Sequence, residues 1–572
     1  MIRARGIATS LWIVARPKKS KGSRARAVRI ALLLALNAAL IAVFWKVGGP
    51  RLWARDHGPT QPAAAALAGT AASALSANAG APVGETAIVR EPAPAAFESR
   101  RDRGLEERIR AAIGDALTKA EAESKGRARR ADMHVGVHVR TAADGAEIAT
   151  IGAERAQRPA SNLKLVTTGA ALVLLGPEWK FQTLLVSDAR IENGVLAGDL
   201  VVRGGGDPLY DAETSGDVTA LVAPAIQALE TAGVQRIAGD IVLDEGRFLD
   251  PGPGPAWPAE GQRWSDFCAL SGAFSANAGC LTARVVPTKP GHAARVEVRP
   301  LGHGLPTKIG VSTGKPRTKL DVRVSAVGGT VVVEGSIPDG IEPWECRFAA
   351  PDPVLLFGGA LRQALTARGI TLTGSVRRER VSRTVATRVL ATIATPILDV
   401  LDPINAHSNN AVADQLYFAL GQAQFGEGTR AGGERATSLA LERLGVPNDG
   451  FAQVDGSGLS RDNRVSARQI TALLAGVSRR GGRASEALFA SMAAPKADGT
   501  LDDRMAGLAG RVRAKTGFIG GTSALSGVVE TESGRTLVFS ILVEYPVMDG
   551  LNARVWKPMQ DRICKLLAGV RE

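Results

Sequence analysis

A serine and a lysine three residues apart are the first candidates for chemistry in this sequence. They are Ser161 and Lys164, in the stretch Ser161-Asn162-Leu163-Lys164. Residues i and i+3 of a helix share a face, so the hydroxyl and the amine would lie side by side. A serine hydroxyl needs an adjacent base to act as a nucleophile, and a lysine can be that base when burial or a nearby cation lowers its pKa. The pair therefore predicts a serine nucleophile that is activated by lysine.

The same spacing occurs a second time, at Ser312 and Lys315. Gly314 and Pro316 disfavour a helix in that copy, so the two side chains would not share a face there. The ten residues after Ser161 are rich in Leu, Val, Thr and Ala and contain no proline. The first copy is therefore the predicted active pair.

A second motif combines a hydroxyl with an amide, in Ser408-Asn409-Asn410. In an extended turn Ser408 and Asn410 point the same way, and a hydroxyl can relay a proton while an amide can bind a substrate amide. The motif leads into a predicted amphipathic helix with Val412, Leu416 and Leu420 as its apolar stripe. The alternative for Ser408 is a simple helix N-cap.

A third motif, Lys515-Thr516-Gly517, occurs once and is typical of a strand edge. In a regular strand Lys515 and Gly517 face one side and Thr516 faces the other. Gly517 would let a substrate backbone approach closely. The lysine cation could bind a carboxylate and keep Lys164 neutral by repulsion. An exposed strand lysine is the alternative.

The elements around these motifs can be predicted from hydrophobic periodicity. Leu105, Ile109, Ile113 and Leu117 recur every four residues and indicate one helix. Alternating residues predict a hairpin over 133–151 and two strands on either side of a turn at 532–535. Further helices are predicted over 161–175, 396–420, 433–444 and 551–570.

The residue pattern changes between the first and second motifs, and this change predicts an inserted region. Short β-rich segments separated by Gly/Pro turns fill residues 188–384. We therefore expect an α/β (α+β) catalytic domain in two halves, 101–187 and 385–572, with a β-rich insert of one or more domains between them.

The N-terminal region explains the basic charge of the chain. Residues 1–29 carry nine Lys/Arg and no Asp or Glu, which accounts for most of the net charge of +14. Residues 30–47 are apolar enough to cross a bilayer, and the preceding charges would hold residues 1–29 in the cytoplasm. A cleaved signal peptide is the alternative. Residues 48–100 have the Ala/Pro/Gly composition of a disordered spacer. This arrangement places the body in the cell envelope, on the outer face of the membrane, and argues against nucleic-acid binding.

Cysteine and histidine usage predicts neither a disulfide scaffold nor a metal site. The four cysteines are too few for a scaffold, although Cys268 and Cys280 are close enough in sequence to bridge a loop. No cysteine pair has zinc-ligand spacing, so we expect no cofactor.

The order Ser-x-x-Lys, Ser-x-Asn, Lys-Thr-Gly is that of penicillin-binding proteins and β-lactamases. The chain resembles the D-alanyl-D-alanine carboxypeptidase/endopeptidases of the penicillin-binding protein 4 type (low-molecular-mass class C) over roughly residues 100–570. The segments GDLVVRGGGDPLY, DGSGLSRDNRVSARQ and ADGTLDDRM and the long insert add to the resemblance. It implies a penicillin-binding/β-lactamase-like transpeptidase fold with a large β-rich insertion.

The resemblance also implies the roles of the site residues. The catalytic residues would be Ser161, Lys164 and Ser408, and the substrate-binding residues Asn410, Lys515, Thr516, Gly517 and Phe518. The implied partners are peptidoglycan stem peptides as substrates and β-lactams as inhibitors. A small hydroxyl residue is common in the family where this chain has Phe518, whose backbone N–H would bind the oxyanion. A β-lactamase or esterase-like hydrolase, or a non-catalytic wall-binding protein on the same fold, is the alternative.

Overall fold

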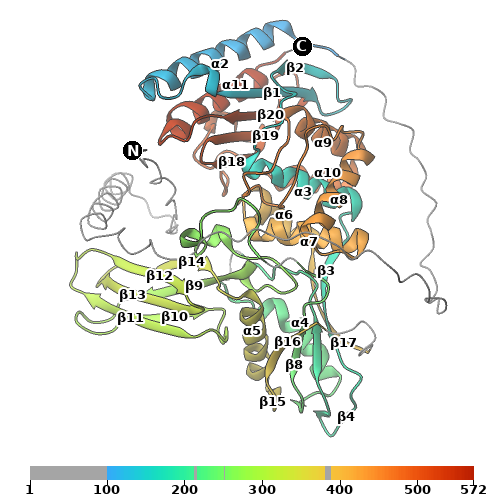
Figure 1. Cartoon of the computed structure of the whole chain (residues 1–572), viewed down its shortest axis with the longest axis vertical. Coiled ribbons are helices and arrows are strands. Elements are labelled where there is room, and N and C mark those ends of the chain that lie inside the picture. The colour runs from blue at the N-terminus through green and yellow to red at the C-terminus, as the bar shows by residue number, and fades with distance from the viewer. Residues whose placement is uncertain (1–98, 212–215, 250–251, 381–387, 572) are drawn as a thin grey trace, which may run out of the picture. The chain divides into compact units, whose positions relative to one another are not determined.

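The computed structural model (Figure 1) describes four stretches of the chain, namely residues 99–211, 216–249, 252–380 and 388–571. The predicted cytoplasmic tail, the membrane segment and all but the end of the spacer lie outside these residues. In the stretches that are described, none of the helices combines the length and apolarity needed to span a bilayer.

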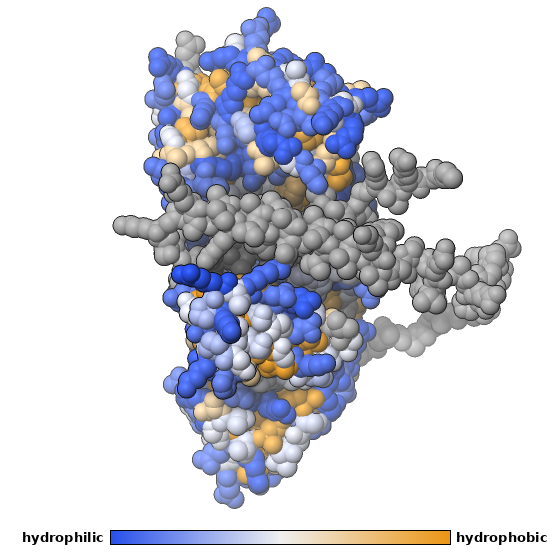
Figure 2. All heavy atoms as spheres, turned by 90° about the vertical axis from the view of Figure 1, so that its left-hand side faces the viewer, coloured by the Kyte–Doolittle hydropathy of each residue, from blue (hydrophilic) through white to orange (hydrophobic). Residues whose placement is uncertain are grey.

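Hydrophilic residues predominate on the face shown in Figure 2, with smaller apolar patches between them. The exposed large apolar side chains of the described residues are Leu249, Leu301, Ile309, Leu320, Leu355, Val389, Phe518 and Val547. Scattered apolar residues of this kind are normal on a folded surface.

A five-stranded antiparallel sheet joins the two ends of the described chain. Its order is β18 (Val512–Ile519), β19 (Thr522–Glu530), β20 (Thr536–Glu544), β1 (His134–Thr141) and β2 (Glu147–Ile151). The predicted hairpins at 133–151 and around 532–535 are confirmed. The two hairpins are joined into one sheet by the pairing of β1 with β20, in which His134 lies opposite Glu544. This pairing leaves β18 at one edge of the sheet.

Helices cover both faces of this sheet (Figure 1). One face packs on α2 (Arg103–Glu123) and α11 (Lys557–Ala568), with the side chains of Phe539 and Ile541 in the shared core. The other face packs on α9 (Ala467–Arg480) and α3 (Leu163–Leu174) through alternate residues such as Val538 and Leu542. The alternation follows from the period of two in a strand.

The remaining α-helices among the described residues of this region are α6 (Ile397–Asn405), α7 (Asn410–Phe425), α8 (Arg430–Arg443) and α10 (Gly482–Ala490). The prediction of a single apolar stripe on α7 is wrong, because every residue from Asn410 to Gly421 is buried. The physical reason is that α7 packs against α3, α6 and α8 and is also covered by the insert. Gly272 N, for example, donates to Gln415 Oε1 at 2.7 Å.

Among its described residues, the insert contributes to four sheets and contains the two α-helices α4 (Thr219–Thr231) and α5 (Pro353–Ala367), so it is less purely β than its sequence pattern suggests. Figure 1 shows how these elements are arranged. One sheet consists of β16 (Val376–Glu379), β8 (Ile241–Asp244), β6 (Leu200–Arg203), β3 (Lys180–Val186) and β17 (Val389–Pro396). Two three-stranded sheets consist of β10 (Arg295–Arg299), β9 (Cys280–Val286) and β14 (Trp344–Ala349), and of β11 (Thr307–Gly314), β13 (Thr330–Pro338) and β12 (Asp321–Val327). A small sheet is formed by β15 (Thr371–Leu372), β7 (Arg236–Ile237), β5 (Val195–Leu196) and β4 (Ile191–Glu192). The boundaries of the insert stay a prediction.

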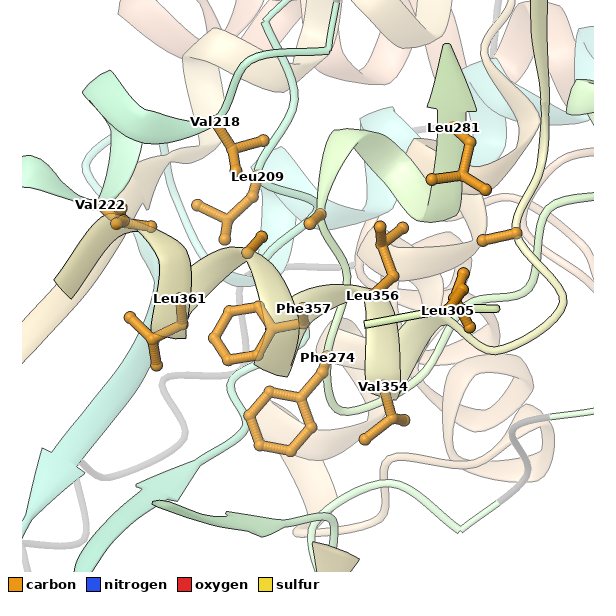
Figure 3. Packing of buried hydrophobic residues seen from close by; sticks show 14 of the residues in the cluster. Leu209, Val218, Val222, Phe274, Leu281, Leu305, Val354, Leu356, Phe357 and Leu361 are labelled. Carbon is orange, nitrogen blue, oxygen red and sulfur yellow. The ribbon is translucent and has the colours of Figure 1, made fainter. Parts of the chain in front are cut away.

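The two helices of the insert, α4 (Thr219–Thr231) and α5 (Pro353–Ala367), help to build a hydrophobic core of its own (Figure 3). The rings of Phe274 and Phe357 lie 4.8 Å apart between their centroids. Such a core lets the insert serve as a rigid support for the loops that it presents.

All four cysteines are free and buried. The bridge between Cys268 and Cys280 that the sequence allowed is not formed. The Cys280 thiol instead lies 3.7 Å from the backbone oxygen of Asp266.

The helix α9 begins with a reciprocal cap that can be tested. Ser466 Oγ accepts a hydrogen bond from Gln469 N, and Gln469 Oε1 accepts one from Ser466 N. We expect Ser466→Ala to lower the free energy of unfolding by ~1 kcal/mol, because a helix N–H loses its partner. Denaturant unfolding measures the change. The control is Ser478→Ala in the same helix, which should leave stability nearly unchanged, and equal losses in both variants would contradict the prediction.

Candidate active site

Ser161 lies at the junction of a short 3-10 turn, η2 (Ala160–Asn162), and the helix α3. Ala160, just before it, has φ 47°, a left-handed conformation that is uncommon for residues other than glycine. The turn thus presents the Ser161 side chain, which is half-buried, at the start of the helix. Lys164, in the first turn of α3, is completely buried.

The amine of Lys164 has three hydrogen-bonding neighbours. Its Nζ lies 3.1 Å from Ser161 Oγ, 2.7 Å from Asn410 Oδ1 and 2.6 Å from the backbone oxygen of Ser457. The orientation of the Asn410 amide is defined by its other end, since Nδ2 donates to the backbone oxygen of Phe267 at 2.9 Å. The predicted pair Ser161 and Lys164 is therefore in contact, and Asn410 joins it.

Two of these three neighbours can only accept. A neutral lysine amine has two N–H groups and one lone pair, and the carbonyl oxygens of Asn410 and Ser457 require both N–H groups. The lone pair is then left for the hydroxyl of Ser161. This arrangement orients Lys164 as the acceptor of the serine proton.

The pKa of Lys164 is lowered from its ordinary value to about 8, with burial as the main cause. The nearby carboxylates Asp414 and Asp455 act in the opposite direction and keep the pKa from falling further. The sequence predicts that either burial or a nearby cation such as Lys515 lowers this pKa. The structure identifies loss of water as the main cause.

The second lysine, Lys515, lies on the edge strand β18 and is also completely buried. Burial, together with repulsion from Lys164, lowers its pKa well below the usual range. Its Nζ donates to the backbone oxygen of Thr516 at 3.0 Å. Asn162 Nδ2 donates to the backbone oxygen of Lys515 at 2.9 Å, and this bond holds β18 beside the turn that carries Ser161.

The residues that follow Lys515 alternate as expected for a strand, with Gly517 buried and Phe518 exposed. A Cβ on Gly517 would lie 2.9 Å from both Asn162 Nδ2 and the backbone oxygen of Pro159. The turn around Ser161 therefore occupies the space that a side chain at position 517 would take. The close approach of a substrate backbone at Gly517 stays a prediction.

Backbone N–H groups point away from the sheet along the outer edge of β18. Ala514 N points away from the sheet and donates to Ala493 O at 2.9 Å. In an antiparallel pair alternate residues face the same way, so the N–H groups of Thr516 and Phe518 also point outward. The Phe518 N–H thus faces away from the sheet, as an oxyanion donor must.

Ser408 has φ 61°, a strained backbone conformation, in the turn before α7. The N-cap of α7 is Asn409, whose side chain accepts from Val412 N at 3.2 Å, so the N-cap alternative for Ser408 is wrong. The Ser408 hydroxyl makes no hydrogen bond to Ser161 or Lys164 among the described residues. Its neighbour Asn410, two residues later, does reach Lys164.

The structure adds residues that the motifs did not identify as part of the site. Asp414, one helical turn after Asn410 on α7, accepts from Gly456 N at 2.7 Å. Burial and the charge of Asp455 raise its pKa to about 8. The segment DGSGL was noted in the sequence, but only the fold shows that its Ser457 carbonyl contacts the lysine amine. The sequence signal for Asp414 is an acidic residue four positions, about one helical turn, after Asn410.

The second Ser-x-x-Lys copy is not part of this site. Ser312 is exposed on β11, in a strand of the insert, as the glycine and proline beside it predicted. Its hydroxyl lies 3.5 Å from the backbone oxygen of Gly335 and has no lysine partner among the described residues.

A mixed α/β fold that places a serine hydroxyl beside a buried lysine amine at the start of a helix is typical of an active-serine hydrolase. The chain matches the D-Ala-D-Ala carboxypeptidase 3 (S13) family over residues 124–568 and belongs to that family. The predicted enzyme class, a serine-type D-Ala-D-Ala carboxypeptidase, is confirmed.

Individual relatives agree with this membership. The chain is 31% identical over 436 residues to a D-alanyl-D-alanine carboxypeptidase of Actinomadura sp. (strain R39), covering 71% of this chain and 77% of that protein. It is 27% identical to the D-alanyl-D-alanine carboxypeptidase DacB of Haemophilus influenzae, over 66% of this chain and 79% of the relative.

Solved structures are similar in fold. A crystal structure of penicillin binding protein 4 (dacB) from Haemophilus influenzae superposes with a TM-score of 0.63 at 24% identity, covering 77% of this chain and 97% of that one. The same protein complexed with a β-lactam superposes with a TM-score of 0.58 at 23% identity, with the same coverage of both chains.

The role of the lysine environment can be tested at Asn410. Asn410→Asp places a carboxylate where Oδ1 lies 2.7 Å from Nζ, so the pKa of Lys164 should rise above about 8. Since the base acts in its neutral form, the acid limb of the acylation rate should move to higher pH. At pH 7 each unit of pKa costs about tenfold in rate. Stopped-flow acylation by a chromogenic β-lactam across pH measures this.

The control for Asn410→Asp is Asn409→Asp, the same change one residue earlier. Aspartate caps a helix as well as asparagine does, so α7 should be preserved and the pH profile unchanged. Profiles of both variants that superpose on the wild type would contradict the assignment of Lys164 as the base.

Proposed function

We propose that the enzyme removes the terminal D-Ala from peptidoglycan stem peptides through an acyl-enzyme on Ser161. Neutral Lys164 takes the proton of the Ser161 hydroxyl, and the serine oxygen bonds to the carbonyl carbon of the penultimate D-Ala. The terminal D-Ala leaves as its nitrogen receives a proton relayed through Ser408. Water then hydrolyses the ester, which releases the shortened peptide and restores the hydroxyl of Ser161.

One observation carries this proposal, the contact of Lys164 with Ser161 and two carbonyl oxygens. Because Asn410 and Ser457 occupy both N–H groups of the neutral amine, the lone pair lies toward the serine proton. A base positioned within hydrogen-bond reach of its proton meets the geometric requirement for general base catalysis.

The developing oxyanion would be held by the backbone N–H groups of Ser161 and Phe518. Ser161 lies where the first N–H groups of α3 have no helical partner, and Phe518 N–H points away from the sheet. Each such donor is typically worth about 3–4 kcal/mol in the transition state.

The substrate carboxylate would bind at Lys515 and Thr516, while Asn410 would bind the substrate amide. A lysine that is buried beside another lysine has a depressed pKa because it lacks a counter-charge. A C-terminal carboxylate supplies that charge, so substrate binding and protonation of Lys515 support each other. The same acyl-enzyme would form with a cross-linked peptide, which gives D,D-endopeptidase action.

β-Lactams would acylate Ser161 in place of the dipeptide. The solved structure of the Haemophilus influenzae protein of similar fold in complex with a β-lactam supports the proposal that this enzyme binds β-lactams.

Labelling with a fluorescent penicillin tests the nucleophile. We expect a labelled band for the wild type, none for Ser161→Ala, and full labelling for the control Ser312→Ala, because Ser312 lies in a strand without a base. Release of D-Ala from a D-Ala-D-Ala peptide should follow the same pattern. Labelling that persists in Ser161→Ala would exclude Ser161 as the nucleophile. Rapid release of the label without peptide turnover would indicate a β-lactamase.

We also propose that residues 30–47 anchor the enzyme in the cytoplasmic membrane, with the catalytic body in the cell envelope. The proposal rests on an apolar run of bilayer length after nine basic residues. The full chain should sediment with membranes and resist carbonate extraction, and a variant lacking residues 1–47 should not. A soluble mature protein that starts after residue 47 would instead show a cleaved signal.

A further inference from the structure

A loop of the insert reaches the segment that contacts the catalytic lysine. Trp257 Nε1 donates to Asp455 Oδ2 at 3.0 Å, and Ser460 Oγ donates to the backbone oxygen of Pro255 at 2.7 Å. Arg430 of α8 donates to the backbone oxygen of Gly252. These three hydrogen bonds connect residues 252–258 with two parts of the catalytic region, namely α8 and the segment that contains Asp455 and Ser460.

The carboxylate that receives the indole N–H is saturated with donors. Asp455 Oδ1 accepts from Gly458 N at 2.8 Å and Asn463 Nδ2 at 2.9 Å, and Oδ2 accepts from Ser460 N at 2.7 Å as well as from Trp257. Four donors thus occupy the acceptor positions of the two Asp455 oxygens. Hydrogen bonds to a carboxylate acceptor are stronger than those between neutral groups. Each of them helps to define the position of the segment 455–463.

The segment 455–463 contacts Lys164 through one carbonyl group, that of Ser457. Ser457 lies between Gly456, whose N–H is held by Asp414, and Gly458, whose N–H is held by Asp455. With both neighbours held, the Ser457 oxygen stays 2.6 Å from Lys164 Nζ. Gly458 has φ 82°, and a Cβ there would lie 1.9 Å from the Ala160 oxygen, so the loop also packs against the turn before the nucleophile.

The insert is shaped to hold the indole in this place. Gly254 is buried, and a Cβ on it would lie 2.4 Å from Trp257 Nε1 and 2.8 Å from Cδ1. Ala256, just before the tryptophan, has the left-handed φ of 52°, a strained conformation. Trp257 and Asp455 also line the same hollow as Asp414 and Tyr417.

We propose that Trp257 is a positioning residue for the acylation reaction, which acts through Asp455 and the Ser457 carbonyl to orient the amine of Lys164. The inference rests on the proposed function of Ser161 and Lys164. It gives the insert a part in catalysis, since an N–H group of the insert maintains the hydrogen bonds that direct the lysine lone pair at the serine.

The charged groups around Lys164 decide the sign of the expected pH effect. Asp414 of α7, Asp455 of the loop and Lys515 of β18 interact electrostatically with the site. The indole N–H offsets part of the charge of Asp455, and that charge favours protonated Lys164. Without the N–H, the acid limb of the acylation rate should move to higher pH.

Trp257→Phe tests the proposal because it keeps a ring and removes the N–H. We expect the first-order acylation rate at pH 7 to fall on the order of threefold to tenfold, part of the value of one hydrogen bond to a charged group. The concentration for half-maximal rate should change little, and the acid limb should move to higher pH. The matched control is Trp344→Phe on β14 of the insert, which should keep the wild-type profile.

A second variant leaves the tryptophan in place. Gly254→Ala puts a Cβ against the indole N–H, and it should reproduce the rate loss and the pH shift of Trp257→Phe. The double variant should be no slower than either single variant, because both break one bond. An unchanged pH profile in both single variants would overturn the proposal, and so would a loss confined to thermal stability. Failure of the wild type to be acylated at Ser161 would instead overturn the proposed function.

Discussion

The burial of a lysine amine between two carbonyl oxygens is the constraint on which this active site depends. A lysine prefers water, and the fold removes that water by enclosing Lys164 between α3, α7 and the DGSGL segment. Loss of water lowers the pKa to about 8. The oxygens of Asn410 and Ser457 then leave one direction for the lone pair, which is the direction of Ser161. Protonation state and orientation thus have one structural cause.

The groups that enclose the lysine come from distant parts of the chain. The antiparallel sheet puts β18 at its edge, and Asn162 binds the Lys515 carbonyl there, so strand and nucleophile turn are held together. The insert contributes as well, because the Phe267 carbonyl accepts from the Asn410 amide and the Trp257 indole donates to Asp455. A region that looks like an appended module is therefore part of the support of the catalytic base.

Sequence periodicity was sufficient for the elements that depend on neighbouring residues. The stripe of Leu105, Ile109 and Ile113 is a helix face buried on the sheet, and both predicted hairpins pair as expected. It failed for α7, where burial on all sides produces no stripe. The alternative role of Ser408 as the N-cap of α7 is also wrong, because Asn409 caps the helix although Ser408 is an equally good capping residue type. Tertiary packing overrides local preference in both cases.

The sequence alone determined the local chemistry of this protein, because a hydroxyl and an amine three residues apart on a helix meet without any other element. It also determined that the copy at Ser312 and Lys315 could not do so. Only the tertiary structure decided what surrounds the pair. Asp414 acts on Lys164 electrostatically and the carbonyl of Ser457 accepts from its amine, although both residues lie roughly 250 to 300 residues away in the chain, and no local pattern records such interactions. The pKa of a buried amine depends on those contacts, so it belongs to the fold and not to the motif.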